Sequence, residues 1–535
     1  MHDTLLLCLG LLLAVCLLVG LSQRLRVAYP ILLVLGGLGL SLLPGLPLVR
    51  INPDLIFLVF LPPLLYEAAW TTSWKDFWRW RRVILFFAFG MVLLTAACVA
   101  LAARAFIPGC TLALGFVLGG IVSPTDAVAA TSIMRSMGLP RRLLAILEGE
   151  SLVNDASGLV VIRFATMAVV SGTFVWHQAA MGLVLMTGVG IAVGLGVAGG
   201  FYAIHRWLRP AANLTTVLTL TAPYLMYVLA EGAHGSGVLA VVSGGLFLSY
   251  HSHTVFSATA RQQAYSTWNT LGFVFNGAVF MLIGLELPEV VAGLDGTSRW
   301  QAVEYGLLIS AVIIGVRLVA ALAGSPFSTF MSRFITVADD HPGWRGPLVA
   351  GYSGMRGVVS LAAALAIPLL GAGGQPFPLR NLLIFITFVV ILVTLVGQGL
   401  TLPLLIRWVG GVEDRDHLRP AAEQHRALQQ LLAQESLTEL AQRYDGQAPA
   451  NELLDLLQHH YELAAHADGS PTAADTISGY NAVLAELLRT QRQRLMQLRQ
   501  QNEYDDEVIR QLENELDLKE ELAASVLPRD TAARE

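Results

Sequence analysis

Charged residues are scarce in this chain of 535 residues. Only 14% of its residues are Asp, Glu, Lys or Arg, whereas 55% are hydrophobic and the mean hydropathy is +0.60. The scarcity ends near residue 410, beyond which charged side chains are dense. This distribution excludes a series of soluble domains. It predicts a membrane domain in a lipid bilayer over residues 1–410 and a polar tail over residues 411–535.

Cysteine is also rare, and so are the signals of a cleavable leader. No basic segment precedes the first apolar run, and Arg24 and Arg26 follow it without a small-residue cleavage site, so we expect a retained helix. The cysteines lie in or beside apolar runs without the spacing of a metal site, which argues against a disulfide framework. They are Cys8, Cys16, Cys98 and Cys110.

Long apolar runs, by contrast, are abundant. Windows of about 20 apolar residues predict an all-α protein with about 13 transmembrane helices. Lys and Arg are about threefold more frequent in one set of alternate loops, which predicts an external N-terminus and a cytoplasmic tail. The expected spans are 4–23, 27–46, 54–70, 83–105, 111–134, 143–170, 178–204, 213–231, 236–251, 267–288, 303–324, 347–372 and 379–406.

Helix-breaking residues interrupt two of these spans. The fifth contains Gly119-Gly120 and Pro124 just before Asp126, and the twelfth contains three glycines around Arg356. The two spans are seven apart and so run in opposite directions, as in an inverted repeat of six helices on either side of one linker helix. Broken helices at matching positions of two inverted halves mark the central site of a transporter. The alternative is that the glycines only allow close helix packing.

The sixth expected span carries polar side chains on a shared surface. Ser151 and Asp155 are four residues apart on one helix face, and Glu150 and Asn154 form a second such pair beside them. A charged side chain at mid-membrane costs about 3 kcal/mol on insertion scales. We therefore expect these side chains to be functional rather than incidental.

A hard monovalent cation needs several oxygen ligands. Asp155, Ser151, Asp126 and a backbone carbonyl near Thr125 could supply them, with Na+ as the expected ion. A carboxylate removed from water holds either a proton or a metal cation, because its uncompensated charge is unfavourable there. This competition suffices for obligatory exchange if the site is exposed to the two sides in turn. The alternative is a hydrogen-bond network that only joins helices.

Five motifs together resemble the monovalent cation/proton antiporter family that contains the Na+/H+ exchangers. The resemblance covers most of residues 1–406 and implies exchange of Na+ or Li+ for H+ by alternating access across a bacterial plasma membrane, with K+/H+ exchange as the alternative. It also implies that the protein is not an enzyme and needs no cofactor beyond the transported ions. The motifs are FLPPLLYEAAW, SPTDAVAATSI, EGESLVNDASG, FVFNGAVFMLIGLELP and SGMRGVVSLAAALAIP.

The resemblance also implies roles for single residues. Asp155 corresponds to the exchange carboxylate, and Asp126, Ser151 and the Thr125 carbonyl would complete the coordination of the ion. Asn154 stands where electrogenic relatives have a second Asp, which implies electroneutral one-for-one exchange. By the same resemblance, Glu150 corresponds to an acid that pairs with the arginine of the broken twelfth span, Arg356.

Other intramembrane charges leave alternatives open. Glu148 either attracts cations at the entrance of the site or lies at a solvated helix end. Arg317 needs a partner, and Glu67 is the nearest acid by expected depth, so we expect a second structural ion pair. Arg163, two turns beyond Asp155, matches no feature of the family.

The tail contains amphipathic segments that predict helices near 416–443, 450–466, 473–500 and 504–525. A small bundle or coiled coil that regulates transport or supports a homodimer is expected; a passive solvated tail is the alternative. No motif identifies a regulatory partner of the tail, and no nucleic-acid partner is expected.

The sequence argues against two functions of other classes. An intramembrane aspartyl protease would need Asp126 and Asp155 in YD and GxGD contexts, and neither context is present. A cation channel would need a continuous aqueous pore, whereas broken helices around one closed site favour a transporter.

Overall fold

Apolar runs fold as helices because a backbone in hydrocarbon must satisfy its hydrogen bonds internally. The computed structural model of the chain describes residues 2–25, 27–43, 56–172, 176–294, 298–331, 343–371, 375–410 and 421–443, and isolated positions between 454 and 519. Within these residues, nine helices are long and apolar enough to cross a membrane, and two shorter apolar helices accompany them. An all-helical protein with several membrane spans is thereby confirmed.

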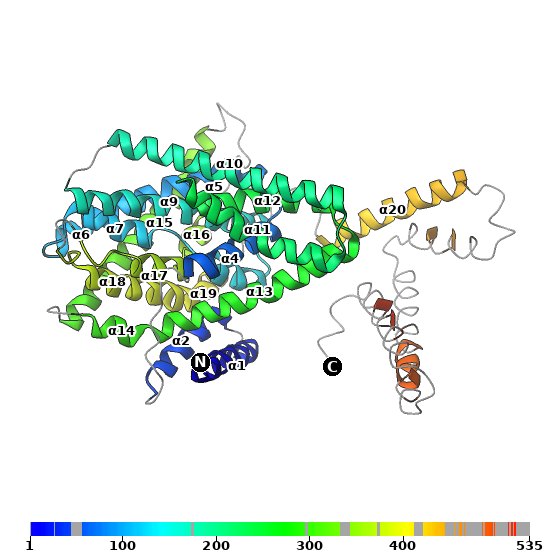
Figure 1. Cartoon of the computed structure of the whole chain (residues 1–535), viewed down its shortest axis with the longest axis horizontal. Coiled ribbons are helices and arrows are strands. Elements are labelled where there is room, and N and C mark those ends of the chain that lie inside the picture. Colours follow the sequence, from blue (N-terminus) through cyan, green and yellow to red (C-terminus); the bar gives the residue numbers. More distant parts are fainter. Residues whose placement is uncertain are drawn as a thin grey trace. The chain divides into compact units, whose positions relative to one another are not determined.

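The helices follow the chain in the order of the expected spans (Figure 1). The first half comprises α1 (His2–Leu25), α2 (Tyr29–Ser41), the π-helix η1 (Ile56–Phe60), α4 (Leu61–Thr71), α5 (Trp74–Leu85), the π-helix η2 (Phe86–Met91), α6 (Val92–Phe106), α7 (Leu112–Val122), α8 (Ala127–Ser136) and α9 (Arg141–Ser171).

The second half begins at α10 (Trp176–Leu208) and continues to the end of the apolar region. It comprises α11 (Ala212–Gly232), α12 (Gly237–Val255), α13 (Ala258–Leu285), α14 (Leu287–Ala292), α15 (Arg299–Met331), α16 (Arg345–Tyr352), α17 (Val358–Leu365), α18 (Arg380–Leu392), the π-helix η4 (Val393–Gln398) and α19 (Gly399–Val409).

Two helices begin earlier than their hydrophobic windows. The continuous helix of α5, η2 and α6 starts at Trp74 rather than at residue 83, and the Ser73 hydroxyl accepts a hydrogen bond from Asp76 N at 3.3 Å. Similarly, α13 starts at Ala258, where the Ser257 hydroxyl accepts from Ala260 N at 3.2 Å. N-cap side chains set these starts, whereas a hydropathy window excludes the polar first turns.

The structure breaks two helices where the glycines and the proline predict. Residues 123–126 separate α7 from α8, and residues 353–357 separate α16 from α17. The two breaks meet, because Asp126 N donates a hydrogen bond to the Met355 carbonyl at 2.8 Å. Four half-helix ends are therefore brought together inside the protein.

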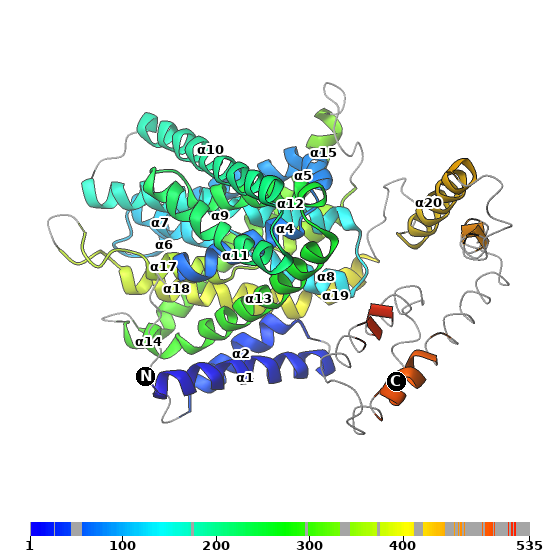
Figure 2. The ribbon, with the colours of Figure 1, turned by 45° about the vertical axis from the view of Figure 1, so that its right-hand side comes forward.

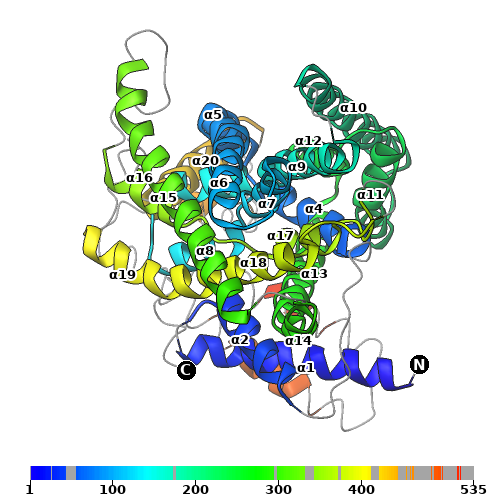
Figure 3. The same ribbon diagram turned by 90° about the vertical axis from the view of Figure 1, so that its left-hand side faces the viewer.

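The helices enclose two large hydrophobic cores. One core joins α2 and α6–α8 to α13 and α15–α19, and the other joins α4 to α10, α11 and α12. In Figures 1 and 3, α10, α11 and α12 lie together on one side of the bundle, and Figure 2 shows α1 running along α2 at another edge. Residues of α9 contribute to both cores, so this helix lies between them.

The chain divides into two units, Met1–Glu413 and Asp414–Glu535. In the second unit, α20 (Ala421–Arg443) falls within the helix expected at 416–443. The helices expected at 450–466, 473–500 and 504–525 lie outside the described residues, apart from isolated helical positions, as does Arg26.

Candidate functional site

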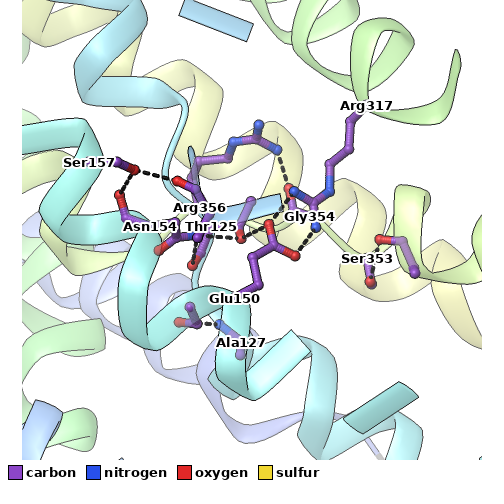
Figure 4. A network of polar contacts seen from close by, with 12 residues as sticks. Thr125, Ala127, Glu150, Asn154, Ser157, Arg317, Ser353, Gly354 and Arg356 are labelled. Carbon is purple, nitrogen blue, oxygen red and sulfur yellow. Dashed lines mark hydrogen bonds and ion pairs between the residues drawn. The ribbon is translucent and has the colours of Figure 1, made fainter. Parts of the chain in front are cut away.

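A buried arginine holds the ends of both broken helices. Arg356 donates through Nε to the Val122 carbonyl at 2.9 Å, at the end of α7, and through Nη1 to the Gly354 carbonyl, just beyond α16 (Figure 4). Its backbone N–H donates to Thr394 Oγ1 at 3.1 Å. Helix C-termini expose unpaired carbonyls and carry partial negative charge, so the guanidinium satisfies both ends at once.

The opposite half-helix ends face a carboxylate. Asp126 is the N-cap of α8, where its Oδ1 accepts from Val128 N at 2.8 Å. Its Oδ2 lies so close to Gly357, at the start of α17, that a Cβ atom there would overlap it. Helix N-termini carry partial positive charge, so the Asp126 carboxyl lies where the starts of two half-helices meet.

The structure corrects the expected partner of Glu150. Arg317 from α15 binds this carboxylate through two hydrogen bonds, Nη1 to Oε1 at 2.6 Å and Nη2 to Oε2 at 2.8 Å, and both side chains are buried. The expected Glu150–Arg356 pair is not formed, because backbone carbonyls bind the Arg356 guanidinium. Gly354 leaves room for Arg317, since a Cβ atom there would overlap the Arg317 guanidinium.

Thr125 and Asn154 tie the break in α7–α8 to α9 (Figure 4). Thr125 Oγ1 donates to Glu150 Oε1 at 3.0 Å, and Asn154 Nδ2 donates to Thr125 Oγ1 at 2.9 Å and to the Thr125 carbonyl at 3.2 Å. Ser157 Oγ, one turn further along α9, donates to the Asn154 carbonyl at 2.8 Å. The unwound segment is therefore fixed against α9 by side-chain hydrogen bonds.

A cavity of about 460 Å³ lies beside this crossing. Asp155, Asp126 and Ser151 all line it, and Ser151 Oγ accepts a hydrogen bond from Ala127 N at 3.3 Å. Three of the four expected oxygen donors are thus brought to one cavity. Thr125, the fourth, is held behind the wall by Asn154, and neither of these two residues lines the cavity.

The cavity extends to an exposed ion pair. Arg135 Nη2, at the end of α8, lies 2.5 Å from Glu148 Oε1, and both residues line the cavity. The Arg135 side chain is 65% exposed and that of Glu148 26% exposed, whereas Asp155 is buried. The cavity therefore leads from this end of the membrane domain to the central carboxylates.

Glu67 does not form the ion pair with Arg317 that the sequence predicts. It was expected to pair with Arg317, but Arg317 binds Glu150, and Glu67 lines the cavity on α4. Gly272 on α13 makes room for it, because a Cβ atom there would lie 3.0 Å from Glu67 Cδ. An acid one turn after two prolines in an apolar run was the available signal.

Arg163, which matched no family feature, is exposed on α9. Its Nη1 lies 3.8 Å from Met186 Sδ on α10. It does not line the cavity.

Residues 10–408 match the family described as sodium/hydrogen exchanger, transmembrane. The chain is 36% identical to an uncharacterized Na+/H+ exchanger of Mycobacterium tuberculosis, over 94% of this chain and 92% of that protein. It is 32% identical to a sodium, potassium, lithium and rubidium/H+ antiporter of Bacillus pumilus, over 70% of this chain and 57% of that protein.

A solved structure shows the same fold. The sodium proton antiporter MjNhaP1 from Methanocaldococcus jannaschii, at pH 8, superposes with a TM-score of 0.57 at 19% identity. The match covers 76% of this chain and 99% of that chain.

Proposed function

Because the chain belongs to the sodium/hydrogen exchanger family, and is thus a multi-pass monovalent cation/proton antiporter and not an enzyme, we propose that it exchanges Na+ or Li+ for H+. The exchange is one for one, by alternating access across the plasma membrane. The observation that carries this proposal is the convergence of Asp155, Asp126 and Ser151 on one cavity that leads to an exposed mouth.

In this proposal Asp155 binds cation and proton in turn. Asp126 and Ser151 supply further oxygen ligands to Na+, and the Thr125 carbonyl joins them if its bond to Asn154 lengthens. Glu67 adds a fourth carboxyl or hydroxyl oxygen on the opposite wall of the cavity. Competition of H+ and Na+ for one buried carboxylate couples the two fluxes, because a neutral Asp155 no longer attracts a cation.

The charges at the crossing support an electroneutral cycle. Three acids, Asp126, Glu150 and Asp155, face two arginines, Arg317 and Arg356. With the Glu67 carboxyl on the cavity wall in its neutral form, the formal charge is −3 + 2 = −1. One Na+ or one H+ neutralises it. Buried charges are favourable only when compensated, so either ion alone completes the site.

K+ is the second candidate cation. The Bacillus pumilus relative is named as an antiporter of sodium, potassium, lithium and rubidium. A cavity of about 460 Å³ is large enough for either ion with water, so its size alone favours neither.

The proposal includes the topology and assembly of the protein. We propose 13 membrane spans with an inverted repeat, an external N-terminus, a cytoplasmic tail and a homodimer. The distribution of Lys and Arg supports the orientation, and the two crossing breaks support the repeat. The tail would then regulate transport or support the dimer.

Ion exchange by the protein in reconstituted vesicles tests the proposed function. The purified chain is reconstituted with an internal pH dye, and Na+, Li+ and K+ are added separately. We expect proton flux driven by Na+ and Li+, and its loss in Asp155→Asn. Glu304→Gln, which removes an exposed acid of α15 away from the cavity, should retain the parent rate. Exchange by Asp155→Asn at the parent rate would refute the role of Asp155 as the exchange carboxylate. Proton flux driven only by K+ would show that K+, and not Na+, is the transported cation.

A further inference from the structure

The helix that contains α5 is longer than a membrane is thick. It runs continuously from Trp74 to Phe106, 33 residues, which is about 50 Å at 1.5 Å per residue. The hydrocarbon core of a bilayer is only about 30 Å thick. Five of the six charged residues of this helix lie in α5, so we place the first turns of α5 at the level of the lipid headgroups.

One face of α5 combines basic and aromatic side chains. Trp74 and Trp78 are 38% and 54% exposed, and their rings stack with centroids 5.6 Å apart. The Arg81 guanidinium lies 4.5 Å from the centroid of the Trp78 ring, and Lys75 is exposed beside Trp74. We call Trp74, Lys75, Trp78 and Arg81 the tryptophan–arginine face.

The charge of α5 is strongly positive. Its 12 residues include Lys75, Arg79, Arg81 and Arg82 against Asp76, a formal charge of 4 − 1 = +3. Tyr250 of α12, 52% exposed, extends the aromatic surface, with its ring centroid 6.4 Å from that of Trp74. Tryptophan and tyrosine favour the membrane interface, and such a positive cluster attracts anionic lipids.

The other face of α5 packs on the helix that carries the site. Phe77 and Ile84 lie against Gly149, where a Cβ atom would be 2.6 Å from Ile84 Cδ1. Trp80 and Ile84 form a small core with Ile146 of α9. Gly149 lies between Glu148 at the mouth and Glu150 at the crossing, so α5 connects the headgroup level to α9.

We propose that the tryptophan–arginine face binds the headgroup of an anionic phospholipid in the leaflet on this side. The lipid phosphate and its negative headgroup pair with Lys75 and Arg81, and its glycerol and upper acyl chain lie on Trp74 and Trp78. A lipid fits better than a free anion, because the aromatic rings lie beside the charges at the depth where hydrocarbon begins. The bound lipid holds α5 against α9.

Brominated lipids test this proposal, because bromine quenches nearby tryptophan. Vesicles contain the full chain and either brominated phosphatidylglycerol or brominated phosphatidylcholine as a minor component. We expect phosphatidylglycerol to quench more strongly, and the excess to vanish in Trp74→Phe/Trp78→Phe. In Lys75→Gln/Arg81→Gln, the apparent affinity for phosphatidylglycerol should fall about fivefold for each positive charge removed.

A matched control separates a local site from diffuse attraction. Arg141→Gln removes an exposed arginine from the start of α9, at the same end but outside α5, and should leave the excess quenching intact. Equal quenching by the two lipids in the parent chain would overturn the proposal, as would an equal loss in Arg141→Gln. Thermal unfolding establishes that each variant is folded, and the measurement does not depend on which ion is transported.

Discussion

At the scale of single residues, two buried arginines near the proposed ion site bind different partners. Arg317 forms a bidentate ion pair with Glu150, and Arg356 binds the backbone carbonyls of two helix ends. Removal of one partner from a buried pair leaves an uncompensated charge, which costs about 3–5 kcal/mol. The stability contributed by Glu150 should therefore depend on Arg317 and not on Arg356.

Paired substitutions measure that dependence. Arg317→Met should lower the free energy of unfolding by about 3–5 kcal/mol, and Glu150→Gln in the same chain should restore part of it. Glu150→Gln should restore no stability to Arg356→Met, because that variant is destabilised by the unpaired carbonyls of Val122 and Gly354. Thermal unfolding of the four variants in detergent is the readout. Better rescue of Arg356→Met than of Arg317→Met would contradict the observed pairing.

The pair at the mouth of the cavity predicts an effect on cation affinity. Glu148→Gln should raise the half-saturating Na+ concentration on that side about twofold to fivefold at low salt, because exposed charge pairs contribute up to about 1 kcal/mol. Arg135→Gln should lower it, and high ionic strength should shrink both effects. Transport from the opposite side serves as control. If Glu148→Gln leaves the half-saturating Na+ concentration unchanged at low salt, Glu148 has no role in attracting cations and only lies at a solvated helix end.

Local spacing predicted the residues that gather at the cavity but not the ion pairs. Ser151 and Asp155 share a helix face by their separation of four, and a break directly before Asp126 points it towards them. Arg317 and Arg356 occupy similar expected depths, and the choice between them depends on how α15 crosses the break. Sequence spacing gives depth along a helix and not the direction of a neighbouring helix.

At the scale of elements, the two broken helices depend on a glycine contact. Gly357→Ala would place a methyl group against Asp126 Oδ2. Overpacking of a tight site costs about 1–3 kcal/mol, so we expect lower stability and strongly reduced exchange. Gly196→Ala on α10, where no atom lies within 4 Å of the added carbon, should be neutral or slightly stabilising. Parent-like exchange by Gly357→Ala would show that the break adjusts freely.

Hydrophobic windows located these helices well because apolar length is a strong signal in a membrane protein. They failed at Trp74 and Ala258, where polar caps begin a helix before the apolar run does. They also could not reveal the π-helical stretches η2 and η4. Thr394 of η4 accepts from Arg356 N, a contact that no periodicity predicts.

At the scale of the whole molecule, the net charge of the site decides the response to voltage. A cycle that trades one Na+ for one H+ moves no charge, whereas one extra charge would couple to the membrane potential by about 2.3 kcal/mol per 100 mV. A valinomycin-imposed potential should therefore leave the exchange rate of vesicles unchanged. A marked acceleration would mean that a second carboxylate, Asp126 or Glu67, also titrates during the cycle.

The backbone bond from Asp126 to Met355 and the missing side chain at Gly357 restrict how the protein can move. The two broken helices contact each other at both places, so neither helix can slide past the other without loss of the hydrogen bond and of the close approach at Gly357. In the proposed alternating-access cycle, we therefore expect the two broken helices to move together as one unit against the wall formed by α4 and α13. The carboxylates would travel with the ion, while Glu67 on that wall would stay behind.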